Sequence, residues 1–404
     1  MASITSANVI GKVLSRIEDP ESLLWGDLDG ALPELLKVFL ESLAVSEVEQ
    51  RLGAKLYERS EDRRDHRNGY RERVVQSSWC TVRIRVPRLR GQGYVPGFLE
   101  RSSRALPEVE SYVSKCLLCG LSRSEVYRLL ESVTGCRPSE EVYRRVQEDL
   151  DARCASWRAR RIDEDVEYLF LDAAWARDLV GPQAARICIL AAKAVDRDGQ
   201  MQMLGFERAP CENTANWRGF LMRLKERGLK PERLRLVICD EHNGLLSAIR
   251  EVFGDVNVQL CWAHRMRNVR GAVRRRDRPE VVAGLRAVYQ ASHRKAALSA
   301  FKSWKQTWVM RYPGVVASVQ QDLRELLAFF DCPEEHRQYV RTTNPIERAF
   351  RELRRQQFGN GAFANRDSCN RAVYRIFLWL NERWKNNNIW HARQRRLARA
   401  KAVA

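Results

Sequence analysis

Three acidic residues stand where a lone carboxylate is unusual. Asp172 closes the apolar run 168–172, Asp240 closes the run 234–240, and Glu347 stands in a segment typical of a helix start. An acid beside a core is costly unless a cation meets it. Carboxylate oxygens are the ligands that Mg²⁺ prefers, and two such ions about 4 Å apart can cleave a phosphodiester. The three acids therefore predict a catalytic site with two Mg²⁺ ions, which Mn²⁺ could replace.

The charge of the chain indicates an anionic partner. Its 404 residues include 70 Lys and Arg against 51 Asp and Glu, a formal net charge of +19. This excess is spread along the chain rather than held in one amphipathic segment, which favours nucleic acid over an anionic membrane. The sequence also lacks the features of a signal peptide and the roughly 20 apolar residues that span a bilayer. We expect a cytoplasmic protein that binds double-stranded DNA and no membrane.

A mixed sheet is expected to position the first two acids. In chain order the patterns predict strands at 166–171, 185–195 and 200–208, a helix at 214–227, a strand ending at Asp240, a helix at 245–253 and a strand at 257–261. Three hairpin-linked strands followed by helix, strand, helix and strand is the order of a ribonuclease H-like fold. That order puts Asp172 in the first strand and Asp240 at the end of the fourth, beside it.

A helix is expected to carry the third acid. Asn344 is a suitable N-cap and Pro345 a suitable first residue, which places Glu347 in the first turn. An acid there often caps its own helix by bonding back to the N-cap residue. The two strand-end aspartates favour the catalytic interpretation of Glu347. Arg348, one residue further on, is expected to contact the scissile phosphate.

Cys261 and His264 form a second feature that could do chemistry. A Cys and a His three residues apart could be half of a zinc site, although the sequence offers no convincing second half. The other interpretation is a structural or substrate-positioning pair near the active site. Asn268 follows on the same expected helix. Both interpretations stay open at this point.

The first hundred residues are expected to be helical, then basic, then extended. Residues 1–55 have helical periodicity, and 57–75 are polar and rich in Arg, as in a solvated loop or an arm that contacts phosphate. Asn68-Gly69 predicts a turn within that segment. Residues 80–87 alternate apolar and basic side chains, which predicts a strand with one Arg-rich face.

Residues 107–150 predict a small helical module. One helix is stopped by Gly120, a second begins with the capping-box pair Ser122 and Glu125, and a third opens near Glu140. This arrangement suits a helix-turn-helix that binds DNA. An ordinary three-helix packing unit fits the pattern equally well.

Six blocks of sequence occur in a fixed order along nearly the whole chain. They are Tyr57–Arg59 with Arg67–Tyr70 and Val86–Arg90, then Gly120–Val126, then Leu171–Asp172, then Asp240–Leu245, then Gln259–His264 with Asn268, and finally Thr342–Glu352. In this order they resemble the Mutator-type transposases of bacterial insertion sequences. The Ala-Ala-Trp-Ala that follows Asp172 and the Ser-Ser-Trp-Cys at 77–80 depart from the residues usual in that family.

The resemblance implies a DDE transposase with a ribonuclease H-like core and an all-helical insertion before its glutamate. It implies divalent metal, binding to terminal inverted repeats and target DNA, a dimer or larger assembly, and work in a bacterial cytoplasm, close to the nucleoid. Further contacts with DNA are then expected from Arg67, Asn68, Ser122 and Arg123, together with Arg348, Cys261, His264 and Asn268.

The expected fold class is therefore a mixture of α+β and α parts, divided into five segments. They are a mainly helical, basic DNA-binding region (1–106), a helix-turn-helix (107–160), the first part of the core (161–264), a helical insertion (265–340), and the completion of the core with a basic tail (341–404). Two alternatives remain: a non-catalytic DNA-binding derivative, and another nuclease of the same fold, such as one that resolves DNA junctions.

Overall fold

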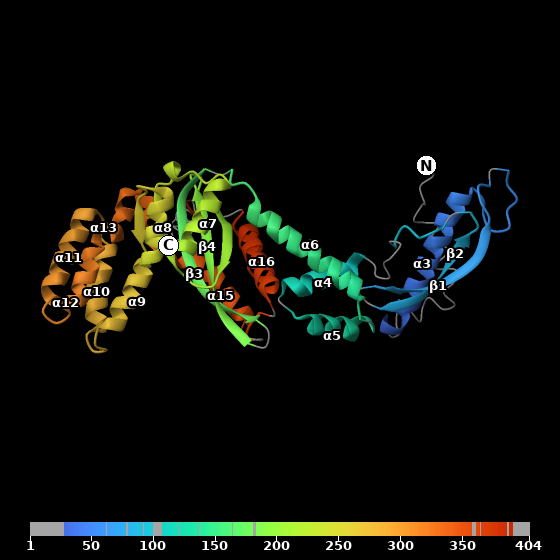
Figure 1. Ribbon diagram of the computed structural model, residues 1–404, viewed down its shortest axis with the longest axis horizontal. Coiled ribbons are helices and arrows are strands. Elements are labelled where there is room, and N and C mark those ends of the chain that lie inside the picture. Colours follow the sequence, from blue (N-terminus) through green and yellow to red (C-terminus); the bar gives the residue numbers. More distant parts are fainter. Residues whose placement is uncertain are drawn as a thin grey trace, which may run out of the picture. The chain divides into compact units, whose positions relative to one another are not determined.

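The computed structural model of the chain divides into two compact units, Met1–Ala152 and Arg153–Ala404 (Figure 1). It describes residues 28–61, 63–77, 80–91, 93–99, 107–119, 121–135, 137–163, 165–180, 183–357, 361–363, 365–385 and 388–390. The first 27 residues of the predicted N-terminal helical segment and the basic tail from 391 lie outside this description. Among the described helices, none is long and apolar enough to cross a membrane. The five finer segments stay a prediction.

The first unit begins with a helix packed on a two-stranded sheet. Helix α3 (Leu28–Leu52) contacts the antiparallel strands β1 (Arg67–Gln76) and β2 (Thr81–Leu89). Apolar side chains of β2 point inward, while the arginines between them are exposed, which confirms the predicted strand with an Arg-rich face. The cluster that these elements share includes Leu40, Val48, Leu52, Val82, Ile84 and Val86.

The prediction of a loop over 57–75 is wrong for its second half, and contact of this segment with phosphate stays a prediction. Residues 67–76 form strand β1, and Asn68-Gly69 is a β-bulge rather than a turn, since the register shifts between Arg67 and Tyr70. Gly69 has a φ of 70°, which glycine adopts without strain. A polar sequence can form β1 because β2 supplies the backbone hydrogen bonds, while most side chains of β1 stay exposed.

Three helices complete the described part of this unit, as predicted. They are α4 (Pro107–Leu118), α5 (Arg123–Thr134) and α6 (Glu140–Ala159). The capping box is present: the Ser122 side chain accepts from the Glu125 backbone, and the Glu125 carboxylate accepts from Ser122 N at 2.7 Å. The helices bury one apolar cluster of Val109, Val113, Val126, Leu130, Val142 and Leu150.

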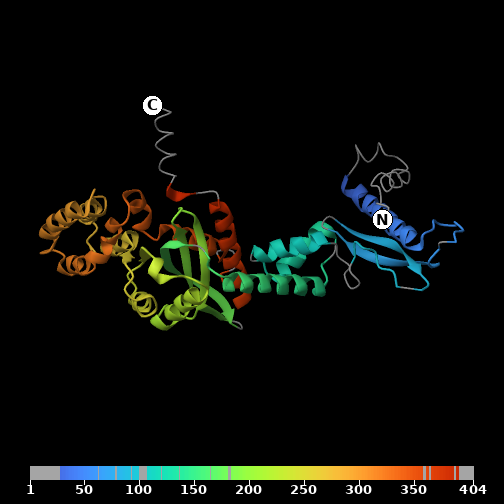
Figure 2. The same ribbon diagram turned by 90° about the horizontal axis from the view of Figure 1, so that it is seen from above.

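The second unit is built on a five-stranded mixed sheet of order β5-β4-β3-β6-β7 (Figure 2). The strands are β3 (Val166–Val180), β4 (Gln183–Asp196), β5 (Met201–Ala209), β6 (Leu236–Cys239) and β7 (Val258–Leu260). The first three pair antiparallel, whereas β6 runs parallel to both β3 and β7. Helices α7 (Thr214–Glu226) and α8 (Asn243–Phe253) join them. The predicted placement of the fourth strand beside the first is therefore what the structure shows.

Strand β3 is much longer than predicted. It continues past Asp172 to Val180, in unbroken register with β4 from Tyr168 onward, so Asp172 lies inside the strand rather than at its end. The acid at the end of an apolar run suggested a strand end, although Ala-Ala-Trp-Ala follows it. The polar groups have partners within the fold instead, as where buried Asp178 pairs with Arg208 at 2.5 Å.

Lys193 is a buried amine in the middle of this sheet. Its side chain is 1% exposed, with Nζ 3.2 Å from Met201 Sδ and about 5 Å from the rings of Phe170 and Trp384. Burial lowers its pKa from 10.5 to about 7. The two rings attract the charged form and offset part of the cost of burying it, but the described contacts of Lys193 include no carboxylate.

We expect Lys193→Met to stabilise the protein by on the order of 3 kcal/mol at pH 8. The unfolded chain holds the proton up to about pH 10.5 and the folded chain only to about 7, so wild-type stability rises with pH between these values. The difference in free energy of unfolding between the variant and wild type should therefore decrease from pH 7 to pH 9. Urea unfolding followed by tryptophan fluorescence measures this difference. Lys302→Met, at an exposed site, is the control; equal midpoints for all three proteins would contradict the prediction.

The helices predicted over 265–340 begin three residues early, at Trp262. They are α9 (Trp262–Ala272), α10 (Arg278–Tyr289), α11 (Arg294–Trp308), α12 (Pro313–Gln321), α13 (Leu323–Leu326) and α14 (Glu334–Val340), with a short 3₁₀ turn at Ala328–Asp331. Two more helices follow, α15 (Asn344–Gln357) and α16 (Arg366–Trp384). Within this unit, α10–α12 lie to one side of the sheet and α16 to the other (Figures 1 and 2).

Candidate active site

Asp172 and Asp240 lie side by side on two neighbouring parallel strands, Asp172 within β3 and Asp240 directly after the end of β6. Phe170 of β3 pairs with Ile238 of β6, and each aspartate lies two residues further along its chain. Asp172 Oδ1 accepts from the backbone of Ala173 at 2.8 Å. Asp240 follows the last residue of β6, and its Oδ1 accepts from His242 N at 3.3 Å. The sheet therefore brings these two acids together.

The charges that act on Asp172 indicate that Glu347 lies near the two aspartates. Burial, with 5% of the residue exposed, raises the pKa of Asp172 to about 7. The positive charge of His264 opposes this rise, and the negative charges of Asp240 and Glu347 add to it. The four groups thus act on one another through a poorly solvated region, as titratable groups of active sites commonly do.

Glu347 lies in the first turn of α15, as predicted. The carbonyl of Thr343 accepts from Ile346 N and Glu347 N at 2.9 and 3.3 Å, so the helix begins at Asn344, one residue before the predicted start. The Glu347 carboxylate is directed at α9 instead of its own helix start: Oε1 accepts from Arg267 Nη2 at 3.0 Å. These contacts differ from those of a capping acid.

Cys261, His264 and Thr343 connect the start of α9 to the start of α15. Thr343 N and Oγ1 lie 3.2 and 3.4 Å from Cys261 Sγ, and Oγ1 is 3.4 Å from His264 Nδ1. A hydrogen bond with Cys261 raises the pKa of His264 to about 9. Burial alone would raise the pKa of Cys261, but its bonds with His264 and Thr343 hold it below the usual value. Each group thus stabilises the charged form of the other, and His264 Nε2 lies 3.6 Å from Glu347 Oε1.

The described residues contain no ready metal cage. Within them, no three His, Cys, Asp or Glu side chains lie close enough together to hold an ion. Cys261 and His264 thus have no third ligand in that part of the chain. The chemistry of Asp172 and Asp240 does suit a hard divalent cation, because both offer carboxylate oxygens and the burial of Asp172 disfavours its unpaired charge. Glu347 is engaged by Arg267 and His264.

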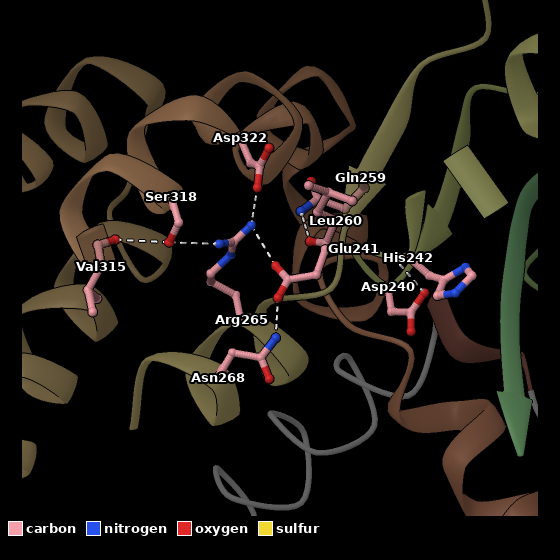
Figure 3. A network of polar contacts seen from close by, with 10 residues as sticks. All are labelled: Asp240, Glu241, His242, Gln259, Leu260, Arg265, Asn268, Val315, Ser318 and Asp322. Carbon is pink, nitrogen blue, oxygen red and sulfur yellow. Dashed lines mark hydrogen bonds and ion pairs between the residues drawn. The ribbon is translucent and has the colours of Figure 1, made fainter. Parts of the chain in front are cut away.

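A polar network fixes the loop that carries Asp240 (Figure 3). The next residue, Glu241, lies 2.5 Å from Nη2 of Arg265, whose side chain is almost fully buried. The same guanidinium contacts Asp322, and the Asn268 amide donates to Glu241. Asn268 therefore supports the loop through Glu241. The sequence showed Arg265 only as part of a charge run, because its partners lie 24 and 57 residues away.

Glu212 is a carboxylate that the sequence analysis missed. It lies between β5 and α7, accepts from Trp217 Nε1 at 3.1 Å, and stands 3.8 Å from His242 Nδ1. Burial, and after it the charge of Asp240, raises the pKa of Glu212. The only local signal was an acid immediately before Asn213, the N-cap of α7, and that pattern is common at helix starts.

The other predicted contacts with DNA stay predictions. Arg67, Asn68, Ser122 and Arg123 belong to the first unit. The Ser122 hydroxyl is used in the cap of α5, Arg123 pairs with Glu140 at 2.9 Å, and Asn68 is exposed. The side chain of Arg348 lies outside the described part of the structure.

Comparison with known proteins identifies the family. Residues 12–387 match the family model described as "Transposase, Mutator family". The chain is 32% identical over 372 residues to the transposase for insertion sequence element IS406 of Burkholderia multivorans, covering 91% of this chain and 95% of that protein. It is 28% identical over 368 residues to the ISRM5 transposase of Rhizobium meliloti (91% and 92%) and 30% identical over 378 residues to the IS1081 transposase of Mycobacterium tuberculosis (92% and 90%). The chain therefore belongs to the Mutator family of transposases, as the order of its sequence blocks predicted.

Proposed function

We propose that this chain is a DDE transposase that binds the terminal inverted repeats of its element and catalyses metal-dependent cleavage and strand transfer of DNA. The observation that carries the proposal is that Asp172, within β3, and Asp240, directly after the parallel strand β6, lie side by side, in one electrostatic site with Glu347. Family membership and the net charge of +19 support it.

The proposed architecture is a ribonuclease H-like core with an all-helical insertion. Its support is the strand order β5-β4-β3-β6-β7 with β6 parallel to β3, and the run of helices from α9 to α14 before Glu347. In the first unit, α4–α6 would act as the helix-turn-helix that binds the repeat, with α5 held by its capping box. A dimer or larger assembly on DNA in the bacterial cytoplasm is proposed from the family resemblance.

The mechanism assigns Asp172, Asp240 and Glu347 as ligands of two Mg²⁺ ions, or Mn²⁺ in their place. Such ions, when bound, activate the attacking oxygen and stabilise the leaving one. His264, kept protonated by Cys261, and Arg267 set positive charge next to the acids, where it would attract a phosphodiester. Water attacks the phosphorus at the element end and releases a 3′-hydroxyl. That hydroxyl then attacks a target phosphodiester and joins the strands.

The test is cleavage and joining of a labelled duplex that carries the element's own terminal repeat. With Mg²⁺ we expect nicking at the repeat end and strand joining, and with EDTA neither. Tight binding without cleavage in Mg²⁺ or Mn²⁺ would instead support the DNA-binding derivative. Faster cleavage of branched DNA than of linear repeat ends would support a junction-resolving nuclease.

A further inference from the structure

A basic pocket lies beside the proposed active site. Its volume is 520 Å³, within the roughly 300–1,000 Å³ of small-molecule sites. Helices α9, α10 and α14 form its walls, together with Arg341 and Thr342, which lead into α15. The pocket is large enough for a phosphate with part of a nucleotide.

Four arginines line this pocket, and no carboxylate does. They are Arg267, Arg270, Arg286 and Arg341. Among the ion pairs of the described residues, only Arg267 has an acidic partner, Glu347. Arg341 donates to the Tyr289 carbonyl at 3.1 Å and lies over the Tyr289 ring, and burial lowers its pKa. Such a concentration of unneutralised guanidinium groups attracts an anion, and the planar fork of arginine matches phosphate.

The pocket and the acidic site share the same two segments of chain. Trp262 and Thr342 line the pocket, while their neighbours Cys261 and Thr343 contact each other on the side of the acids. Arg267 belongs to both, since it lines the pocket and donates to Glu347 at 3.0 Å. A DNA strand held at the acids would therefore carry its neighbouring phosphates past the pocket.

We propose that this pocket binds phosphate groups of the DNA strand that passes the acidic site. The proposal rests on the proposed function and adds a specific contact to it. Arg270 and Arg286, which are exposed on α9 and α10, would bind the strand directly. Arg341, half-buried against Tyr289, would supply charge at the base of the pocket.

The test combines a double variant with neutral phosphates. Binding of wild type and of Arg270→Gln/Arg286→Gln to the terminal-repeat duplex is measured by fluorescence anisotropy in EDTA, which prevents cleavage. A series of duplexes each carries one methylphosphonate, which removes a single phosphate charge. The matched control, Arg275→Gln/Lys302→Gln, removes two exposed charges from the same insertion outside the pocket. Thermal unfolding midpoints should be alike for all three proteins.

We expect wild type and control to lose affinity at the same one or two adjacent methylphosphonates. The double variant should bind the unmodified duplex about 10-fold more weakly, and the slope of log affinity against log salt should be smaller by about 1–2. A methylphosphonate at those positions should not weaken its binding further. If the double variant keeps the wild-type pattern at every position, the pocket does not bind the strand. A third outcome would assign the pocket to a free nucleotide instead. In that outcome wild type binds labelled dAMP, the double variant does not, and both proteins show the same methylphosphonate pattern.

This experiment separates the pocket from the catalytic proposal. Wild type that binds the repeat and shows the expected pattern, but never cleaves in Mg²⁺, would refute the catalysis and support the pocket. If wild type cleaves normally and the double variant shows the wild-type methylphosphonate pattern, the pocket proposal alone is refuted. No binding of the repeat duplex by wild type would refute both.

Discussion

Asp240→Asn is expected to reduce strand cleavage by more than 100-fold while leaving binding to the terminal repeat intact. Asparagine has the shape of aspartate but lacks the charge that would hold a divalent cation between β3 and β6. Loss of a group that merely supports a metal ligand costs roughly 10–100-fold, so loss of a ligand should exceed that range. The measurement is the initial rate at which 3′-hydroxyl ends form in Mg²⁺.

The matched control is Asp255→Asn. Asp255 is exposed beyond the end of α8, and its substitution makes the same chemical change without touching the site. It should cleave at the wild-type rate. An Asp240→Asn protein that cleaves as fast as the control would remove Asp240 from the mechanism, whatever the family resemblance implies.

Arg265→Met is expected to lower the free energy of unfolding by about 1–3 kcal/mol. The guanidinium is almost fully buried between Glu241 and Asp322, and its loss leaves two acids facing each other without their cation. Urea unfolding followed by tryptophan fluorescence measures the change. Cleavage assayed well below the unfolding transition should also fall, because Glu241 adjoins Asp240.

Two further variants make this prediction specific. Arg275→Met, at an exposed arginine, should change stability by no more than about 0.5 kcal/mol. Arg265→Met combined with Glu241→Gln and Asp322→Asn should recover much of the loss, because the two partly buried acids no longer face each other without a cation. A single variant as stable as the Arg275→Met protein would show that the network does not hold the loop.

The sequence was most informative where local patterns decide the structure. Apolar runs predicted the strands of the second unit, and their order among the helices predicted that Asp172 lies beside Asp240. The capping box predicted the start of α5 from two residues three apart. The strands and the cap depend on residues close in the chain, whereas the pairing of β3 with β6 joins residues 68 apart and was predicted from the succession of strands and helices.

The misses have the opposite cause. The polar strand β1 forms because β2 pairs with it, and β3 extends to Val180 because β4 and Arg208 meet its polar end. The contact of Cys261 with Thr343 spans 82 residues, and no local pattern encodes it. The basic pocket arises in the same way, from helices that are separated in sequence.

The bond between Cys261 and Thr343 has a consequence for how the chain can change length. Together with the hydrogen bond from Trp262 N to the Arg341 carbonyl at 3.1 Å, it joins the entry and the exit of the insertion. The helices between these two contacts therefore form a segment whose two ends lie next to each other. Doubling the length of a segment closed in this way costs only about 0.6 kcal/mol in closure entropy. The loops that connect these helices can therefore lengthen while Asp240 and Glu347 keep their spacing.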